Sequence, residues 1–64
     1  MVTAKQRAVL EYITEHTASH GYQPSYREIA AHLGVVVSTV YLHINALERK
    51  GYVERRGNRA VYIR

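Results

Sequence analysis

The sequence predicts three α-helices followed by a two-stranded antiparallel β-hairpin, on three observations. Two runs of apolar residues at helical spacing each follow a capping-box pattern, a Thr or Ser with a Gln or Glu three residues later. A glycine stands where each expected helix should end. Near the C-terminus, two short strand-like segments flank a Gly-Asn pair, which is typical of a tight hairpin turn. We therefore expect a mainly α protein with a small β-hairpin.

The first helix is expected to run from its cap, Thr3, to about His20. Gln6 completes the capping box, in which each side chain binds the backbone N–H of the other residue. Helical spacing gives the helix a packing face made of Val2, Gln6, Val9, Leu10, Ile13 and Thr17. The face left to water is made of Arg7, Glu11, Thr14, Glu15 and Ala18. We interpret this helix as a support, with Lys5 and Arg7 near enough to its N-terminus to contact a phosphate.

A short link is expected after the first helix. Gly21 ends that helix, and Pro24 excludes the helical conformation at Gln23. Residues 22–24 should therefore be extended, with a short strand as one option.

The second helix is expected to be short. Ser25 and Glu28 make the second capping box, so the helix should begin at Tyr26 and end at Gly34 after about two turns. Its inward face should consist of Ile29, Ala30 and Leu33. The small Ala30 lets a neighbouring helix approach closely, so these residues predict the first half of a helix-turn-helix.

The third helix should begin near Ser38 or Thr39, because either hydroxyl can accept from the free N–H groups of a first turn. Gly51 should cap its end. Its inward stripe is Val40, Ile44 and Leu47. The opposite side carries Ser38, Leu42, Asn45 and Arg49, flanked by Thr39, Tyr41 and Ala46. Because this side is neither charged nor polar enough for a merely solvated helix, we expect it to face the major groove of DNA.

The C-terminal residues predict the hairpin. Residues 52–56 and 59–64 are expected to pair as strands around Gly57-Asn58, with glycine supplying the positive φ that such a turn requires. The core beneath the helices should be closed by Val53, Val61 and Ile63. The tip should gather Arg55, Arg56 and Arg59. The complete order is that of a winged helix-turn-helix.

Length and composition limit the chain to one domain, residues 1–64. There is no cysteine, so neither a disulfide nor a thiolate zinc site supports the small core. Charges interrupt residues 1–16 before any apolar run is long enough for a signal peptide or a membrane span. We expect a cytoplasmic protein with no membrane partner.

The charge of +4 is unevenly distributed. Residues 1–48 carry three basic and four acidic groups, whereas residues 49–64 carry six basic groups against Glu54 alone. A basic end this concentrated indicates a polyanionic partner. The alternative is a weakly basic, solvated surface.

Four segments carry a resemblance to a known family: Thr3-Ala4-Lys5-Gln6, GYQPSYREIAAHLG (21–34), STVYLHI (38–44) and ALERKGYVERR (46–56). They resemble the N-terminal DNA-binding domain of the LexA repressor, the bacterial SOS regulator, over nearly the whole chain. The most specific piece is Gly-x-x-Pro-Ser-x-Arg-Glu-Ile-Ala. The resemblance implies base contacts from Ser38, Thr39, Tyr41 and Leu42, and backbone contacts from around Arg27 and the wing.

Three departures from LexA limit what the resemblance implies. The turn at residues 35–37 is one residue shorter and wholly apolar. Tyr41 and Leu42 replace smaller or more polar residues, so the operator sequence cannot be transferred. These 64 residues also contain no self-cleavage site, catalytic serine and lysine, or dimerisation domain, so autoproteolysis is not implied.

The candidate base-reading residues have alternative roles. Leu42 either contacts a thymine methyl, belongs to an apolar patch for a protein partner, or is incidentally exposed, and the major-groove geometry favours the first. Ser38 is assigned to readout rather than capping. Asn45 lies on the same face, and base readout and simple solvation both stay open for it.

The candidate phosphate contacts are Lys5, Arg7, Arg27, Arg49, Arg55, Arg56, Asn58 and Arg59. Three guanidinium groups around a tight turn repel one another unless an anion lies nearby. Phosphate or minor-groove contact is therefore favoured over a solvated hairpin.

The sequence predicts neither an enzyme nor a cofactor. His16 and His20 are spaced to chelate a metal, but no carboxylate or cysteine is placed to complete the shell, so we expect no metal site. His32 and His43 are assigned to packing or phosphate contact. No grouping of nucleophile, base and oxyanion donors is present, and no small-molecule substrate is expected.

The function predicted is sequence-specific binding of double-stranded DNA by a transcriptional repressor or regulator. The protein is expected to be bacterial or encoded by a phage or plasmid, and to be nucleoid-associated in the cytoplasm. We expect a monomer in solution that binds adjacent half-sites as two copies. The rival is a winged-helix protein-interaction module, whose binding would depend less on salt.

Overall fold

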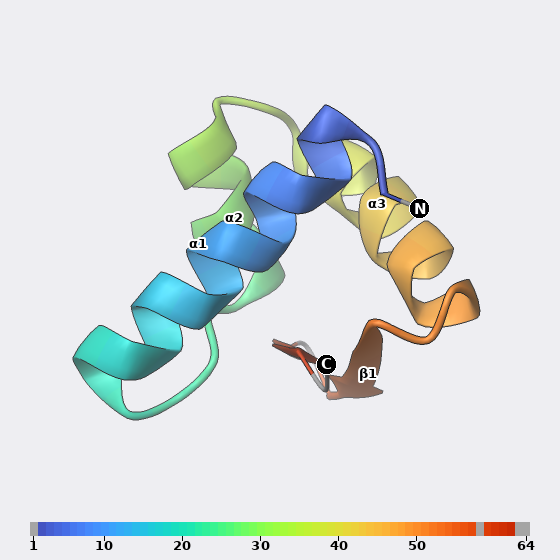
Figure 1. Cartoon of the computed structure of the whole chain (residues 1–64). Coiled ribbons are helices and arrows are strands. Elements are labelled where there is room, and N and C mark those ends of the chain that lie inside the picture. The colour runs from blue at the N-terminus through green and yellow to red at the C-terminus, as the bar shows by residue number, and fades with distance from the viewer. Residues whose placement is uncertain (1, 58, 63–64) are drawn as a thin grey trace.

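The computed structural model describes residues 2–57 and 59–62, and it contains three helices and a hairpin in the predicted order (Figure 1). The helices are α1 (Ala4–His20), α2 (Tyr26–Leu33) and α3 (Val37–Arg49), and the strands are β1 (Val53–Arg56) and β2 (Arg59–Tyr62). In the view of Figure 1, α1 lies in front of α2, α3 lies to the right of α1, and the hairpin lies below the helices. The hairpin is thus placed as the wing of a winged helix-turn-helix.

Both predicted capping boxes are confirmed. Thr3 and Gln6 exchange two hydrogen bonds of 3.1 Å, each from a backbone N–H to the other side chain. At the start of α2, the Glu28 N–H donates to the Ser25 hydroxyl (3.2 Å) and the Ser25 N–H donates to the Glu28 carboxylate (2.7 Å). These bonds satisfy N–H groups that have no partner inside a helix, and they fix where α1 and α2 begin.

The predicted start of α3 is wrong. The helix begins at Val37, its N-cap is Val36, and no side chain caps it. Val36 is extended (φ −79°, ψ 157°), and its carbonyl accepts from the Thr39 N–H (3.1 Å) and the Val40 N–H (3.4 Å). Because the turn after α2 is so short, Ser38 and Thr39 already lie inside the first helical turn. Their side chains are therefore left for other contacts.

The predicted end of α3 is confirmed at Gly51, which has a φ of 86°. The Gly51 N–H donates to the Glu48 carbonyl (3.0 Å), and the Tyr52 N–H donates to the Leu47 carbonyl (2.9 Å). These two bonds are those of a Schellman motif. The motif requires a residue in the left-handed backbone conformation, which glycine adopts without steric cost. The motif turns the chain sharply from α3 into β1.

The core draws on every element. Its buried apolar residues are Val9, Leu10, Ile13, Tyr26, Ile29, Ala30, Val40, Ile44, Leu47, Val53 and Ala60. Among the expected inward residues, Val2, Thr17 and Leu33 are only partly buried. His16, which the sequence places at the edge of the apolar face, is 6% exposed. The core thus includes one titratable side chain on α1.

The register of the hairpin corrects one predicted core residue. Arg56 pairs with Arg59 across the two-residue turn, Arg55 pairs with Ala60, and Val61 pairs with Glu54. Since side chains alternate between the faces of a strand, Ala60 and not Val61 lies on the core side. Ala60 is fully buried, whereas Val61 is partly exposed. Gly57 has the expected positive φ of 63°, while Asn58 and Ile63 lie outside the described residues.

The link before α2 contacts the hairpin. The optional strand at residues 22–24 is not found there, but Ser25 forms an isolated antiparallel bridge with Arg59. The axes of α2 and α3 differ by 108° at the turn between them, within the range of a helix-turn-helix. In the described part of the chain, no single helix is long and apolar enough to span a membrane. Only α2 and α3 taken together reach that length and apolar composition, and they are bent at the turn between them.

Candidate nucleic-acid interface

The outward side of α3 carries the five predicted base-reading residues. Its inward side is tightly packed, because Val40, Ile44 and Leu47 are fully buried. The opposite side exposes Leu42 (68%) and Tyr41 (41%), with Ser38 and Asn45 exposed and Thr39 partly so. The helix therefore exposes hydroxyl, amide and apolar groups on the side away from the core.

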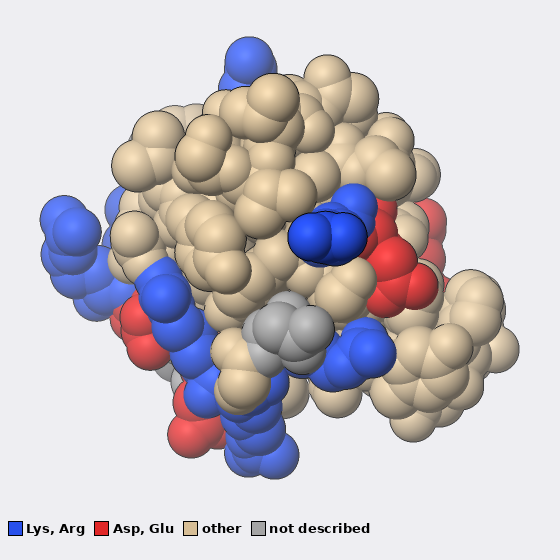
Figure 2. Space-filling view, turned by 180° about the vertical axis from the view of Figure 1, so that it is seen from behind, with Lys and Arg blue, Asp and Glu red and all other residues tan. Residues whose placement is uncertain are grey.

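The basic side chains around α2 and α3 lie mainly at the edges of the face opposite α1. Figure 2 shows the side away from α1, where a broad uncharged surface has Lys and Arg side chains mainly along its left and lower edges, with Glu side chains among them at the lower left and right. An uncharged centre with a basic margin suits a duplex, whose base edges lie in the groove between two rows of phosphates.

Tyr41 is oriented by a neighbour on α2. Its ring meets that of Tyr26 edge-on, with centroids 4.8 Å apart and planes at 70°. With Ser25, Arg27 and Val37, the two tyrosines line a hollow of about 280 Å³ between the N-terminal ends of α2 and α3. Arg27 is exposed at this hollow. An anion placed there would meet a guanidinium group and the positive end of a helix dipole.

Tyr26 is buried together with its polar hydroxyl group. Its hydroxyl has no hydrogen-bond partner among the described residues. Burial raises the pKa of this phenol, while the nearby Arg55 guanidinium acts in the opposite direction. The phenol therefore stays neutral and serves as a packing surface for Tyr41.

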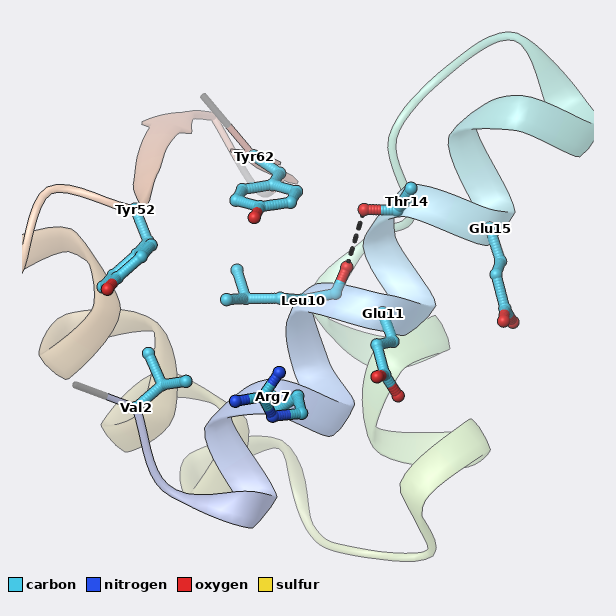
Figure 3. Close-up of a pocket in the computed structure, with 8 residues that line it drawn as sticks. All are labelled: Val2, Arg7, Leu10, Glu11, Thr14, Glu15, Tyr52 and Tyr62. Atoms are coloured by element: carbon cyan, nitrogen blue, oxygen red, sulfur yellow. Dashed lines mark hydrogen bonds between the residues drawn. The ribbon is translucent and has the colours of Figure 1, made fainter. Parts of the chain in front are cut away.

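The predicted phosphate contacts outside the wing do not all lie together. Arg27 and Arg49 belong to the helix-turn-helix, and both are exposed. Arg7 lies elsewhere, in a groove of about 570 Å³ between α1 and the hairpin. Figure 3 shows its side chain below the rings of Tyr52 and Tyr62. None of the predicted base-reading residues lines this groove. Lys5 is exposed in the first turn of α1.

The three wing arginines have carboxylate partners in the protein. Arg55 Nε lies 3.0 Å from Glu48 Oε1, and Arg56 Nη2 lies 3.0 Å from Glu54 Oε1. Arg59 Nη1 lies 3.7 Å from a Glu28 oxygen. The predicted mutual repulsion at the tip is therefore relieved within the fold. Repulsion alone does not require an external anion.

Glu28 joins three elements, which the sequence did not reveal. Beyond its capping bond to Ser25, it approaches Arg59 of β2 and His16 of α1, whose Nε2 lies 3.6 Å from Glu28 Oε2. The pKa of Glu28 is lowered, chiefly by the backbone N–H of Ser25 and further by the Ser25 hydroxyl, His16 and Arg59. The capping box identified Glu28, but its second role depends on residues far away in the sequence.

The two spaced histidines of α1 are engaged with the protein. Their rings stack with centroids 4.1 Å apart. Nδ1 of His16 lies 3.1 Å from the Tyr22 carbonyl oxygen, and Nδ1 of His20 lies 3.1 Å from the His16 carbonyl oxygen. Among residues 2–57 and 59–62, no group of three or more His, Cys, Asp or Glu side chains is placed to hold a metal ion.

Comparison with known proteins decides the family. The family model described as the LexA DNA binding domain matches residues 1–60. The chain belongs to this family. LexA repressor 2 of Geobacter sulfurreducens is 53% identical over 55 residues, which are 84% of this chain and 27% of that protein. The LexA repressor of Thermotoga neapolitana is 47% identical over 58 residues, which are 91% of this chain and 29% of the relative.

A third relative, the LexA repressor of Thermotoga maritima, is 41% identical over 63 residues, or 98% of this chain and 32% of the relative. The chain thus spans about a third or less of the LexA repressors it matches. Membership in the LexA DNA-binding domain family and the order of three helices and a two-stranded sheet both confirm the winged helix-turn-helix.

Proposed function

We propose that this LexA-family domain binds double-stranded DNA sequence-specifically and represses transcription by occupying its operator. The observation that carries the proposal is the outward side of α3, which exposes 68% of Leu42 beside unused polar groups in a member of a DNA-binding family. In this arrangement, α3 enters the major groove and the wing lies against the neighbouring backbone. The protein acts in the cytoplasm and performs no catalytic step.

Base recognition is assigned to the exposed side of α3. The hydroxyls of Ser38 and Thr39 and the amide of Asn45 can donate to or accept from base edges in the major groove. Leu42 contacts a thymine methyl group, which only the major groove presents. Tyr41, oriented by Tyr26, borders the contact on the side of α2.

Phosphate contact is assigned to exposed basic groups around α3. Arg27 at the start of α2 and Arg49 at the end of α3 flank the recognition surface, with Arg56 on the wing. Lys5, Arg7 and Asn58 are candidates for further contacts. Because each neutralised phosphate releases counterions, affinity should fall steeply as salt rises.

Selection of a duplex from random sequence, followed by repetition with Leu42→Ala, tests the proposal. The wild-type chain should return one motif. The variant should lose preference at one thymine by about 1 kcal/mol, the order expected for one buried methyl contact, while keeping its affinity for random DNA. Folding should be unaffected, because Leu42 lies mostly outside the core. Selection of no motif by the wild-type chain would contradict sequence-specific binding.

A protein-interaction module is the second candidate, favoured by the exposure of two apolar side chains, Val36 (65%) and Leu42 (68%). Salt dependence distinguishes the two functions. Contact with phosphates weakens steeply with salt, whereas an apolar protein contact does not. A partner bound equally well at low and high salt would support the module.

A further inference from the structure

We propose that Glu28 on α2 and Glu48 on α3 position the wing for DNA by holding Arg59 and Arg55, which leaves Arg56 as the wing arginine that contacts phosphate. This inference rests on the proposed DNA binding. It assigns different roles to three arginines that the sequence treats as one cluster. The glutamates are positioning residues, because each acts through the arginine that it holds.

Arg59 is held against the helix-turn-helix by four separate contacts. Its guanidinium donates to the Gln23 carbonyl, lies 3.7 Å from Glu28, and lies over the Tyr22 ring at 5.3 Å from the centroid. Its backbone forms the bridge with Ser25. These contacts attach β2 to the link and to the first turn of α2. Both polar contacts use Nη1, so Arg59 can offer a phosphate only the remaining N–H groups of a side chain that is 38% exposed.

Arg55 makes the corresponding attachment from the other strand. Its Nε is buried and lies 3.0 Å from Glu48 Oε1 in the last turns of α3, as an ion pair without the geometry of a hydrogen bond, and its side chain is 33% exposed. Arg55 and Arg59 belong to different strands near the turn, where Arg55 pairs with Ala60 and Arg56 pairs with Arg59. The hairpin is thus attached to both helices of the helix-turn-helix, one helix through each strand.

Arg56 differs from both neighbours. Its side chain is 66% exposed, and its partner, Glu54, stands two residues away on the same strand. That pair connects the wing to no other element. Arg56 can therefore turn toward a phosphate without releasing the wing from the helices.

The attachment matters because the described residues of the hairpin bury few apolar side chains. A two-stranded hairpin is marginally stable on its own, and each strand here has four residues. Among its described residues, the buried apolar side chains are Val53 and Ala60. A partly exposed ion pair changes a population by up to about fivefold. Such a change is small for folding but is enough to alter how often the wing lies where DNA requires it.

The test uses Glu28→Gln and Glu48→Gln, separately and together. Glutamine at position 28 can keep the capping box, as Gln6 already does for α1 in this chain. The substitution therefore removes the charge opposite Arg59 and His16 without removing the cap. The probe is a labelled duplex selected by the wild-type chain, and affinity is measured by fluorescence anisotropy over a range of salt concentrations.

The direction of the change is decisive. Removing an acidic group from a DNA-binding protein normally strengthens its binding to DNA, because one repulsion is lost. If the glutamates position the wing, each variant should instead bind up to about fivefold more weakly. Hydroxyl-radical protection should be lost under the wing and kept under α3. The matched control is Glu54→Gln, which removes the same charge from the wing surface and should tighten binding.

Equal or tighter binding by Glu28→Gln and Glu48→Gln would overturn the inference and assign Arg55 and Arg59 to phosphate contact. Thermal unfolding should show that both variants fold. Amide exchange in β1 and β2 without DNA provides an independent measurement, and it should be faster in both variants than in Glu54→Gln. This measurement separates a failed inference from a failed function, because it needs no DNA.

Discussion

Arg56 is the most exposed of the three wing arginines, and its carboxylate partner lies on its own strand. Truncating it should remove one phosphate contact and disturb nothing in the core. We expect Arg56→Ala to weaken binding to all duplexes by a similar factor and to reduce the slope of log affinity against log salt by about 0.9.

Arg59→Ala is the substitution to compare with Arg56→Ala. It should also weaken DNA binding, but unlike Arg56→Ala it should accelerate amide exchange in the wing. Measuring both slopes for one duplex compares a contacting arginine with a positioning one. A salt slope unchanged by Arg56→Ala would remove this residue from the interface.

The lowered pKa of Glu28 makes stability depend on pH. The folded state keeps Glu28 ionised through the Ser25 N–H and hydroxyl, with His16 and Arg59 nearby. A carboxyl group whose pKa is lower in the folded state stabilises the fold above its unfolded pKa, and that stabilisation is lost as the pH falls through the folded pKa. Thermal unfolding should therefore show a decrease in Tm below about pH 4.3. The decrease in Tm should be smaller in Glu28→Gln than in the wild-type chain. An identical dependence of Tm on pH in the two proteins would contradict this role of Glu28.

Residue by residue, the sequence predicted what local chemistry determines. The partners of Ser25 and Thr3 were correct because a capping box involves residues three positions apart. Attachment of Glu28 to Arg59 was not predicted, because only the folded chain brings α2 and β2 together. The burial of His16 was missed for a similar reason, since its Nδ1 partner is a carbonyl in the link that follows α1.

Among the helices, α3 is the one that starts without a side-chain cap. Val36 already has the extended backbone of an N-cap residue and is 65% exposed. A serine there can accept from the N–H of Ser38, the second residue of the helix, since the Thr39 N–H already donates to the carbonyl of residue 36. We expect Val36→Ser to stabilise the fold by about 1 kcal/mol, which corresponds to a rise in Tm of roughly 4–8 °C for a domain of this size.

Val36→Ala serves as the control, because it removes the same apolar exposure and supplies no acceptor. Stability should be measured by thermal unfolding, and DNA affinity separately, since Val36 lies next to the recognition surface. No difference in Tm between the serine and alanine variants would show that the first turn of α3 gains nothing from a cap.

The first and last residues of the helices and strands show which parts of the secondary structure the sequence could predict. The three helices end where glycines adopt a positive φ, and each of these ends was predicted. The start of α3 was missed because Ser38 and Thr39 are both typical N-cap residues. The turn at residues 35–36 is so short that the helix begins before them, at Val37. The wing was predicted, but the choice of Ala60 over Val61 depends on a register that no local pattern specifies.

For the whole molecule, the basic C-terminal end and the order of elements indicated the fold and the class of partner. The sequence did not reveal that carboxylates from both helices of the helix-turn-helix attach the wing. Net charge counts groups without placing them, and here three of the five acidic groups lie beside wing arginines. The basic end is thus less available to a polyanion than its charge suggests, which shifts the expected phosphate contacts toward Arg27, Arg49 and Arg56.

The surface also bears on assembly. One recognition helix with one wing buries about 600–1,000 Å² on DNA, which is modest for tight specific binding and favours two copies on adjacent half-sites. Exposed apolar groups include Val36 and Leu42, and the proposed interface would cover the latter. One edge of the hairpin is partly occupied, because Arg59 of β2 bridges to Ser25.

We therefore predict that the 64-residue chain is a monomer at micromolar concentration. Sedimentation without DNA should give a mass near 7.3 kDa. Titration of a duplex with two half-sites should bind two chains, and a single half-site should bind one. A stable dimer in the absence of DNA would contradict the prediction. It would point to the turn around Val36 as the contact, since the bridge to Ser25 leaves β2 a shorter free edge for pairing with a second copy.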